Sequence, residues 1–202
     1  MISAPDFRTL RVFINDEALE IGRTEMLRDD LRLDFRDGAL LATTVWRTAE
    51  GHRVAVTART MISFSDRHLA LQDLHVRLLD APANVIVQSS LIGYRSQRPV
   101  ASPGELDGSG SAADPRRAEE ASVNPLVQAG HRRDGARMGI AYDVAGSGMS
   151  VAAMVEHQVT TTGGGTPLVD LTRTVSEERA EEVATARLDA GQGLRVAKFA
   201  VF

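Results

Sequence analysis

Apolar and polar residues alternate with period two along three segments of the chain. In residues 54–64 the even positions are apolar, with one threonine among them, whereas Thr57 and Arg59 belong to the opposite face. Segments 84–92 and 149–159 repeat this alternation. Period two is typical of strands that bury one face and expose the other. We therefore predict a half-buried strand in each of these three segments.

Further segments are rich in β-forming residues and are bounded by turn sequences such as Asp37-Gly38 and Asp134-Gly135. They are 10–14, 31–35, 40–48, 69–79, 136–144, 168–175 and 194–202. The turns are short and no strand–helix rhythm separates the strands, which favours antiparallel hairpins joined in series. The pattern predicts an all-β fold in which two antiparallel sheets stack as a sandwich.

One segment does not follow the strand pattern. In residues 176–188, Ala180, Val183, Ala184 and Leu188 recur at helical spacing. Local periodicity alone therefore predicts a helix here. The acidic residues of the same segment, including Glu182, are interpreted as a solvated surface.

Length and composition limit the class of protein. The chain has 202 residues, 43% of them apolar, and no cysteine, which excludes disulfides, thiolate zinc sites and cysteine nucleophiles. Its net charge is −4, so we expect no nucleic acid as a partner, and because its apolar runs are only a few residues long we expect no membrane partner. No leader or membrane-spanning run is visible, and we expect a cytoplasmic location. Residues 1–202 are interpreted as one domain with a Pro/Gly/Ser-rich loop inserted at 99–125.

Few residues suggest chemistry. The five histidines are scattered without ligand spacing, so no metal is expected, and no cofactor motif is present. Ser65, Asp66, Arg67 and His68 form a polar cluster between two predicted strands, which we interpret as a turn that bonds its own backbone. The alternative is an acid–base pair in which Asp66 orients His68.

Aromatic side chains offer a second candidate site. The only tryptophan, Trp46, lies in a predicted strand, where core packing is the favoured interpretation and stacking on a sugar ring is the alternative. Tyr94 and Tyr142 are further candidates for carbohydrate contact.

Several segments together resemble a known family. They are 10–15, 33–41, Trp46, 59–70, 89–93, 147–152 and 194–199. Their order and spacing resemble the N-terminal domain of glycoside hydrolase family 65, which includes maltose, kojibiose and trehalose phosphorylases and trehalose hydrolases. The likeness covers nearly the whole chain except the loop at 99–125.

The resemblance implies a large mutarotase-like β super-sandwich. In that family an (α/α)6 barrel follows the sandwich and holds the catalytic acid and the phosphate-binding residues, so no catalytic residue can be assigned here. The resemblance implies a structural role for Ser65–His68, a strand at 182–188, and a sandwich incomplete at both ends. It implies a non-catalytic part of an α-glucoside phosphorylase or hydrolase.

Two alternatives stay open from the sequence. The chain is either a stand-alone carbohydrate-binding module or a module that docks on a separately encoded barrel. Apolar surface and unpaired strand edges also lead us to expect a homo-oligomer.

Overall fold

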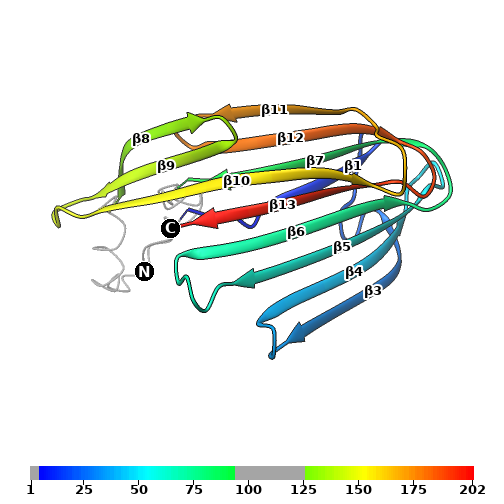
Figure 1. The fold of residues 1–202 in the computed structure, drawn as a ribbon, viewed down its shortest axis with the longest axis horizontal. Coiled ribbons are helices and arrows are strands. Elements are labelled where there is room, and N and C mark those ends of the chain that lie inside the picture. Colours follow the sequence, from blue (N-terminus) through cyan, green and yellow to red (C-terminus); the bar gives the residue numbers. More distant parts are fainter. Residues whose placement is uncertain (1–4, 94–125) are drawn as a thin grey trace, which may run out of the picture.

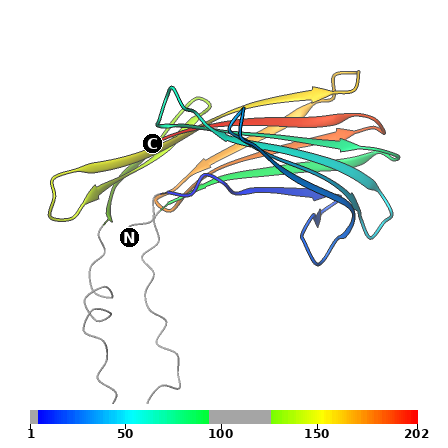
Figure 2. The ribbon, with the colours of Figure 1, turned by 90° about the horizontal axis from the view of Figure 1, so that it is seen from below.

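The computed structural model describes residues 5–93 and 126–202, and these contain thirteen strands and no helix. The strands form two antiparallel sheets that stack as a twisted sandwich (Figures 1 and 2). The all-β sandwich predicted from the sequence is thereby confirmed. The described residues contain no helix that could span a membrane. The loop predicted at 99–125, like Tyr94, lies outside the described residues.

The smaller sheet has five strands in the order β11-β12-β7-β1-β2. These are β1 (Leu10–Ile14), β2 (Glu17–Ala18), β7 (Ala83–Ile92), β11 (Val169–Val175) and β12 (Arg179–Leu188).

The larger sheet has eight strands in the order β3-β4-β5-β6-β13-β10-β9-β8. These are β3 (Glu25–Asp34), β4 (Ala39–Arg47), β5 (Arg53–Ile62), β6 (Leu69–Leu78), β8 (Leu126–Asp134), β9 (Arg137–Val144), β10 (Ser150–Thr162) and β13 (Gly193–Val201).

The helix expected from local spacing at 176–188 is wrong, because β12 occupies most of that segment. It pairs with β7 along its whole length, from Arg179 opposite Ile92 to Leu188 opposite Ala83. Its buried residues are every second one, which is the period of a strand. Tertiary pairing decides this segment, and the strand implied by the family resemblance is confirmed.

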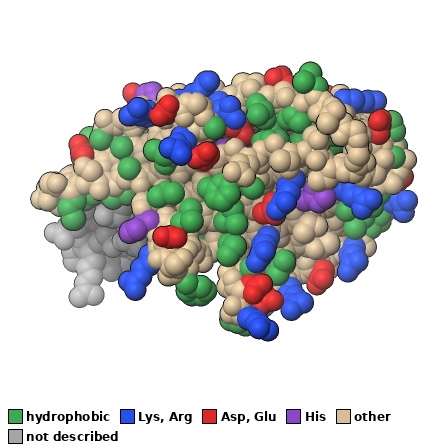
Figure 3. Space-filling model, in the orientation of Figure 1, with side chains coloured by type: hydrophobic (Ala, Val, Ile, Leu, Met, Phe, Trp, Pro, Cys, Tyr) green, Lys and Arg blue, Asp and Glu red, His purple; other side chains and the backbone are tan. Residues whose placement is uncertain are grey.

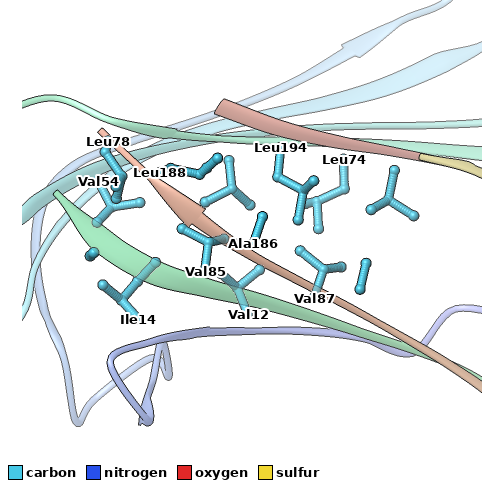
Figure 4. Close-up of a cluster of buried hydrophobic side chains, with 14 residues drawn as sticks. Val12, Ile14, Val54, Leu74, Leu78, Val85, Val87, Ala186, Leu188 and Leu194 are labelled. Atoms are coloured by element: carbon cyan, nitrogen blue, oxygen red, sulfur yellow. The ribbon is translucent and has the colours of Figure 1, made fainter. Parts of the chain in front are cut away.

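A cluster of buried hydrophobic side chains fills one half of the sandwich interior (Figure 4). Val85 and Val87 of β7 and Leu188 of β12 pack there against Val76 of β6 and Leu194 of β13, and all five side chains are buried. These residues follow the alternation of their strands, so the period-two pattern produces the core directly. Burial of such side chains supplies about 1.5–3 kcal/mol each relative to exposure.

The two sheets differ in width. Figure 1 shows β3 and β4 extending past the smaller sheet. On the core-facing side of β3 and β4, Leu31, Leu33 and Leu40 are exposed, as is Ile62 at the end of β5. The smaller sheet therefore leaves part of the apolar face of the larger one uncovered.

Candidate functional site

The polar cluster from Ser65 to His68 lies in the turn between β5 and β6, and all four residues are exposed. The Asp66 N–H donates to Ser63 Oγ (3.0 Å), and the Leu69 N–H donates to the Asp66 carbonyl (2.9 Å). These contacts are those of a self-bonded turn. The geometry therefore favours the structural interpretation of this cluster over an acid–base pair.

The aromatic candidates lie inside the sandwich. Trp46 is 6% exposed and its indole N–H donates to Thr44 Oγ1 (2.7 Å), while Tyr142 is buried in the half of the interior around β9. A ring that stacks on a sugar must present a face to solvent. The placement of both rings favours core packing, and a sugar contact would require them to leave it.

Three ionisable side chains are enclosed between the sheets: His157 of β10, Glu182 of β12 and Lys198 of β13. The interpretation of Glu182 as solvated surface is wrong, because its side chain is 1% exposed. Its position on β12 is an inward one, since Ala180 and Ala184 on either side of it are also buried. The sequence analysis did not predict that these three residues are buried together, because a single polar residue on an apolar strand face gives no sign that it has buried partners.

Lys198 holds the first described residues of the chain against the sandwich. Its ammonium group donates to the carbonyl oxygens of Phe7 and Ser90, the latter at 2.8 Å. Nearby, the Gln72 side chain donates to the Arg8 carbonyl (3.2 Å). Burial lowers the pKa of Lys198 to about 7, against a smaller opposing effect of the Asp6 carboxylate. The amine therefore acts as a clamp for backbone carbonyls.

His157 and Glu182 form a second group beside this clamp. His157 Nε2 lies 2.7 Å from Ser89 Oγ, and Arg173 Nε donates to Glu182 Oε2 (2.5 Å). Burial lowers the pKa of His157 to about 3, with help from the positive charges of Lys198 and Arg173. Burial also raises the pKa of Glu182, which the Arg173 guanidinium opposes.

This arrangement is unsuited to catalysis. The side chains of His157 and Glu182 are 0% and 1% exposed, so a substrate has no access to either group. A general acid or base must reach the proton that it transfers. The described residues also contain no group of three side chains placed to hold a metal ion. We therefore treat the buried charged cluster, His157, Glu182 and Lys198 with their partners, as structural.

The outer face of the larger sheet carries an apolar hollow of about 650 Å³ over β8, β9, β10 and β13. Met154, Val201 and Phe202 line it and are each more than one-third exposed. Figure 3 shows hydrophobic side chains gathered on this face. The Arg137–Glu156 ion pair (2.9 Å) lies among the lining residues. Exposed apolar patches of this kind are typical of sites where another protein surface packs.

A smaller, more polar hollow of about 250 Å³ adjoins the apolar one through Phe199. Arg195 binds both carboxylate oxygens of Asp73 there, at 2.7 and 2.8 Å. An aromatic edge beside a fixed ion pair offers both an apolar contact and hydrogen-bonding groups. This hollow therefore combines two kinds of contact that a polar ligand such as a sugar makes.

The whole chain, residues 1–202, matches the model of the glycosyl hydrolase family 65 N-terminal domain. The chain belongs to this family. It is 24% identical over 202 residues to an uncharacterized glycosyl hydrolase of Mycobacterium tuberculosis, and equally so to one of Mycobacterium leprae, spanning 24% of each relative's length. A kojibiose phosphorylase of Escherichia coli is 26% identical over 91 residues, which are 45% of this chain and 12% of that protein.

A solved structure supports the same fold. A putative kojibiose phosphorylase from the human microbiome superposes with a TM-score of 0.73 at 13% identity, over 99% of this chain and 22% of that one. The super-sandwich implied by the sequence resemblance is therefore found in a longer protein. The present chain spans about a quarter of the length of these relatives.

Proposed function

We propose that this chain is a non-catalytic N-terminal sandwich of a family 65 α-glucoside phosphorylase or hydrolase that acts on a disaccharide such as maltose, trehalose or kojibiose. Within this proposal, residues 1–202 form one domain on which a catalytic (α/α)6 barrel docks. The cytoplasmic location expected from the sequence belongs to the same proposal, and cell fractionation tests it.

The apolar hollow on the larger sheet carries the proposal. Phe202 lies on its wall, so a polypeptide that continued beyond this residue would begin at the hollow. In relatives about four times longer, a second domain joined there would lie next to exposed Met154 and Val201. Packing on the hollow would remove their apolar area from water, at about 25 cal/mol per Å².

Co-purification tests this docking. The chain is co-expressed with the catalytic region of the mycobacterial relative, made without its own sandwich. We expect a complex with the unmodified chain, its loss in the double variant Met154→Glu/Val201→Glu, and its retention in Leu168→Glu. Leu168 is a matched control because it is 88% exposed and does not line the hollow. Equal recovery of all three proteins would contradict docking at this face.

Carbohydrate binding is the second candidate function, and the polar hollow around Phe199 is the observation that favours it. Titration calorimetry with malto- and gluco-oligosaccharides distinguishes the candidates. Heat of binding that disappears in Phe199→Ala would establish a sugar site, whereas no heat would leave docking as the function of this face. Binding that survives Phe199→Ala but is lost in Trp46→Phe would instead support the alternative interpretation of Trp46 as a sugar contact.

A further inference from the structure

Strand β3 forms the free edge of the part of the larger sheet that extends past the smaller one. β3 ends the larger sheet, and β4 is its only sheet neighbour among the described strands. Nine of its ten residues are exposed, in contrast to the half-buried strands elsewhere. An edge strand presents backbone N–H and C=O groups that can pair with another strand.

The pairing of β3 with β4 fixes which face each side chain occupies. Leu33 lies opposite Leu40 of β4, and Leu40 lies opposite Thr60 of β5. Thr60 in turn lies opposite Gln72 of β6, which is buried. Residues in one such row share a face of the sheet, so Leu33, and with it Leu31, is on the core-facing side. The even positions are therefore on the outer face. Arg32 and Asp34, which share that face, form an ion pair at 3.4 Å.

The outer face of β3 carries charges of alternating sign. After the register shift between Met26 and Arg28, the even positions to the end of the strand are Arg28, Asp30, Arg32 and Asp34. Charges that protect an edge from pairing need no such order. An alternating series, in contrast, becomes complementary to itself when a second copy runs antiparallel to it.

We propose that β3 pairs antiparallel with β3 of a second copy of this chain across a two-fold axis, with Leu31 opposite its own counterpart. In this register Asp30 faces Arg32 and Arg28 faces Asp34, each pair occurring twice by symmetry. The two larger sheets join edge to edge, and the exposed Leu31 of each copy meets its counterpart on the core-facing side. Such an interface is isologous and closed, as in most symmetric dimers.

Charge selects this register over its neighbours. A two-fold axis normal to the sheet places the outer faces of the two copies on the same side. The only other registers to consider are therefore those that still pair outer-face residues with outer-face residues. Shifting the register toward the end of β3 sets Arg32 opposite Arg32, so like charges face each other. Shifting it toward the start of β3 sets Asp30 opposite Asp30, with the same result. A second shift in the direction of the end of β3 pairs Leu33 with Leu33. Because β3 ends at Asp34, this register would leave only a very short ladder of paired residues.

The interface also has a cost and a limited size. Asp29 lies on the core-facing side and would stand opposite Leu33 of the second copy. One strand pair buries less than the roughly 800 Å² per partner of a standard stable interface. We therefore expect a concentration-dependent dimer, which Asp29→Leu strengthens.

Charge exchange tests the pairing directly. In sedimentation velocity over a dilution series, we expect the unmodified chain to dimerise and Asp30→Arg and Arg32→Asp each to stay monomeric. The double variant Asp30→Arg/Arg32→Asp restores the dimer, and mixing the two single variants produces a heterodimer, because opposite charges again face each other. Asp30 and Arg32 are both exposed, and circular dichroism verifies that each variant is folded.

Cross-linking tests the register, since the chain contains no cysteine. Leu31→Cys is expected to form a disulfide-linked dimer under mild oxidation. Leu33→Cys is the control, because its two sulfurs would be separated by about four residues along the strands, roughly 13 Å.

Three outcomes overturn the proposal. The first is a monomer at every concentration. The second is a dimer that neither single charge variant weakens, which would place the contact elsewhere. The third is cross-linking of Leu33→Cys in preference to Leu31→Cys, which would replace the register.

Discussion

The two halves of the sandwich interior are stabilised in different ways. The half around Val85 and Leu194 is filled by a hydrophobic cluster, whereas the other contains an ammonium, an imidazole and a carboxylate beside its own hydrophobic cluster, between the same two sheets. Hydrophobic burial is non-directional and tolerates small shifts of the strands. The clamp from Lys198 to Phe7 and Ser90 is directional, because each donor must meet a particular carbonyl.

This difference indicates a division of roles. The hydrophobic cluster around Val85 and Leu194 stabilises the sandwich by burial, and the buried charged cluster fixes where the first described residues lie. Replacing a buried polar network with apolar groups can leave stability nearly unchanged, while removing one member leaves the others unsatisfied. The two halves should therefore respond differently to substitution.

The largest expected effect is in the apolar half. Leu188→Ala removes a fully buried side chain from β12 and leaves a cavity between the sheets. We expect the free energy of unfolding to fall by about 3 kcal/mol, within the range for such truncations. Urea denaturation monitored by far-UV circular dichroism measures it. A loss below about 1 kcal/mol would show that packing at Leu188 contributes little to stability.

The next effect concerns the clamp. Lys198→Met keeps a similar volume but leaves the carbonyls of Phe7 and Ser90 without their donor, so we expect a loss of about 2 kcal/mol. Hydrogen exchange should also rise locally at Ile92, whose N–H donates to the Asp6 carbonyl. Leu188→Ala serves as the control, since it lowers global stability without loosening this contact selectively. Unchanged exchange at Ile92 would contradict the clamp.

The third prediction is a pH dependence of stability. The pKa of His157 is about 3 in the folded chain and about 6.5 when unfolded, so between these values the unfolded state binds more protons. The free energy of unfolding should therefore fall as pH decreases from about 6.5 toward 3, by at most about 1.4 kcal/mol per pH unit for this one proton.

His157→Gln provides the control for this slope. Glutamine can keep a hydrogen bond to Ser89 but does not titrate. Acidic groups with lowered pKa values, such as Asp6 and Asp80, contribute equally to both proteins. The slope difference between the two proteins therefore reports His157 alone, and identical slopes would show that the imidazole does not resist protonation.

The smallest effect is expected at an ion pair outside the interior. Asp73→Asn breaks the contact with Arg195 on the outer face, where the arginine side chain is 53% exposed. Exposed ion pairs contribute about 0.2–1 kcal/mol, so the free energy of unfolding should fall by less than in the substitutions above. A loss as large as that of Lys198→Met would remove the contrast between buried and exposed charges.

The sequence predicted strands well where one face is buried. Residues 54–64 and 84–92 alternate visibly, and β5 and β7 occupy them. The strand expected at 31–35 proved longer, because the first residues of β3 are exposed on both faces and show no alternation. β8 was not predicted for the same reason, since most of its residues are exposed. Edge strands lack the signal on which periodicity depends.

The buried charged cluster was harder to predict. Lys198 lies between Val196 and Ala200 at inward positions of β13, so the alternation of this strand contained the signal. Its partners come from β7 and from the segment before β1, and only the fold brings these together. The hollow around Met154 and Phe202 could not be predicted from the sequence either, because it depends on which face of the sheet stays uncovered.

Activity of the purified chain tests the proposed function most directly. Release of glucose or glucose 1-phosphate is measured from maltose, trehalose and kojibiose, with and without phosphate. We expect no release above a heat-denatured control, because the ionisable cluster of the sandwich is closed to substrate. Turnover above that control, with any of the three disaccharides, would contradict a non-catalytic role.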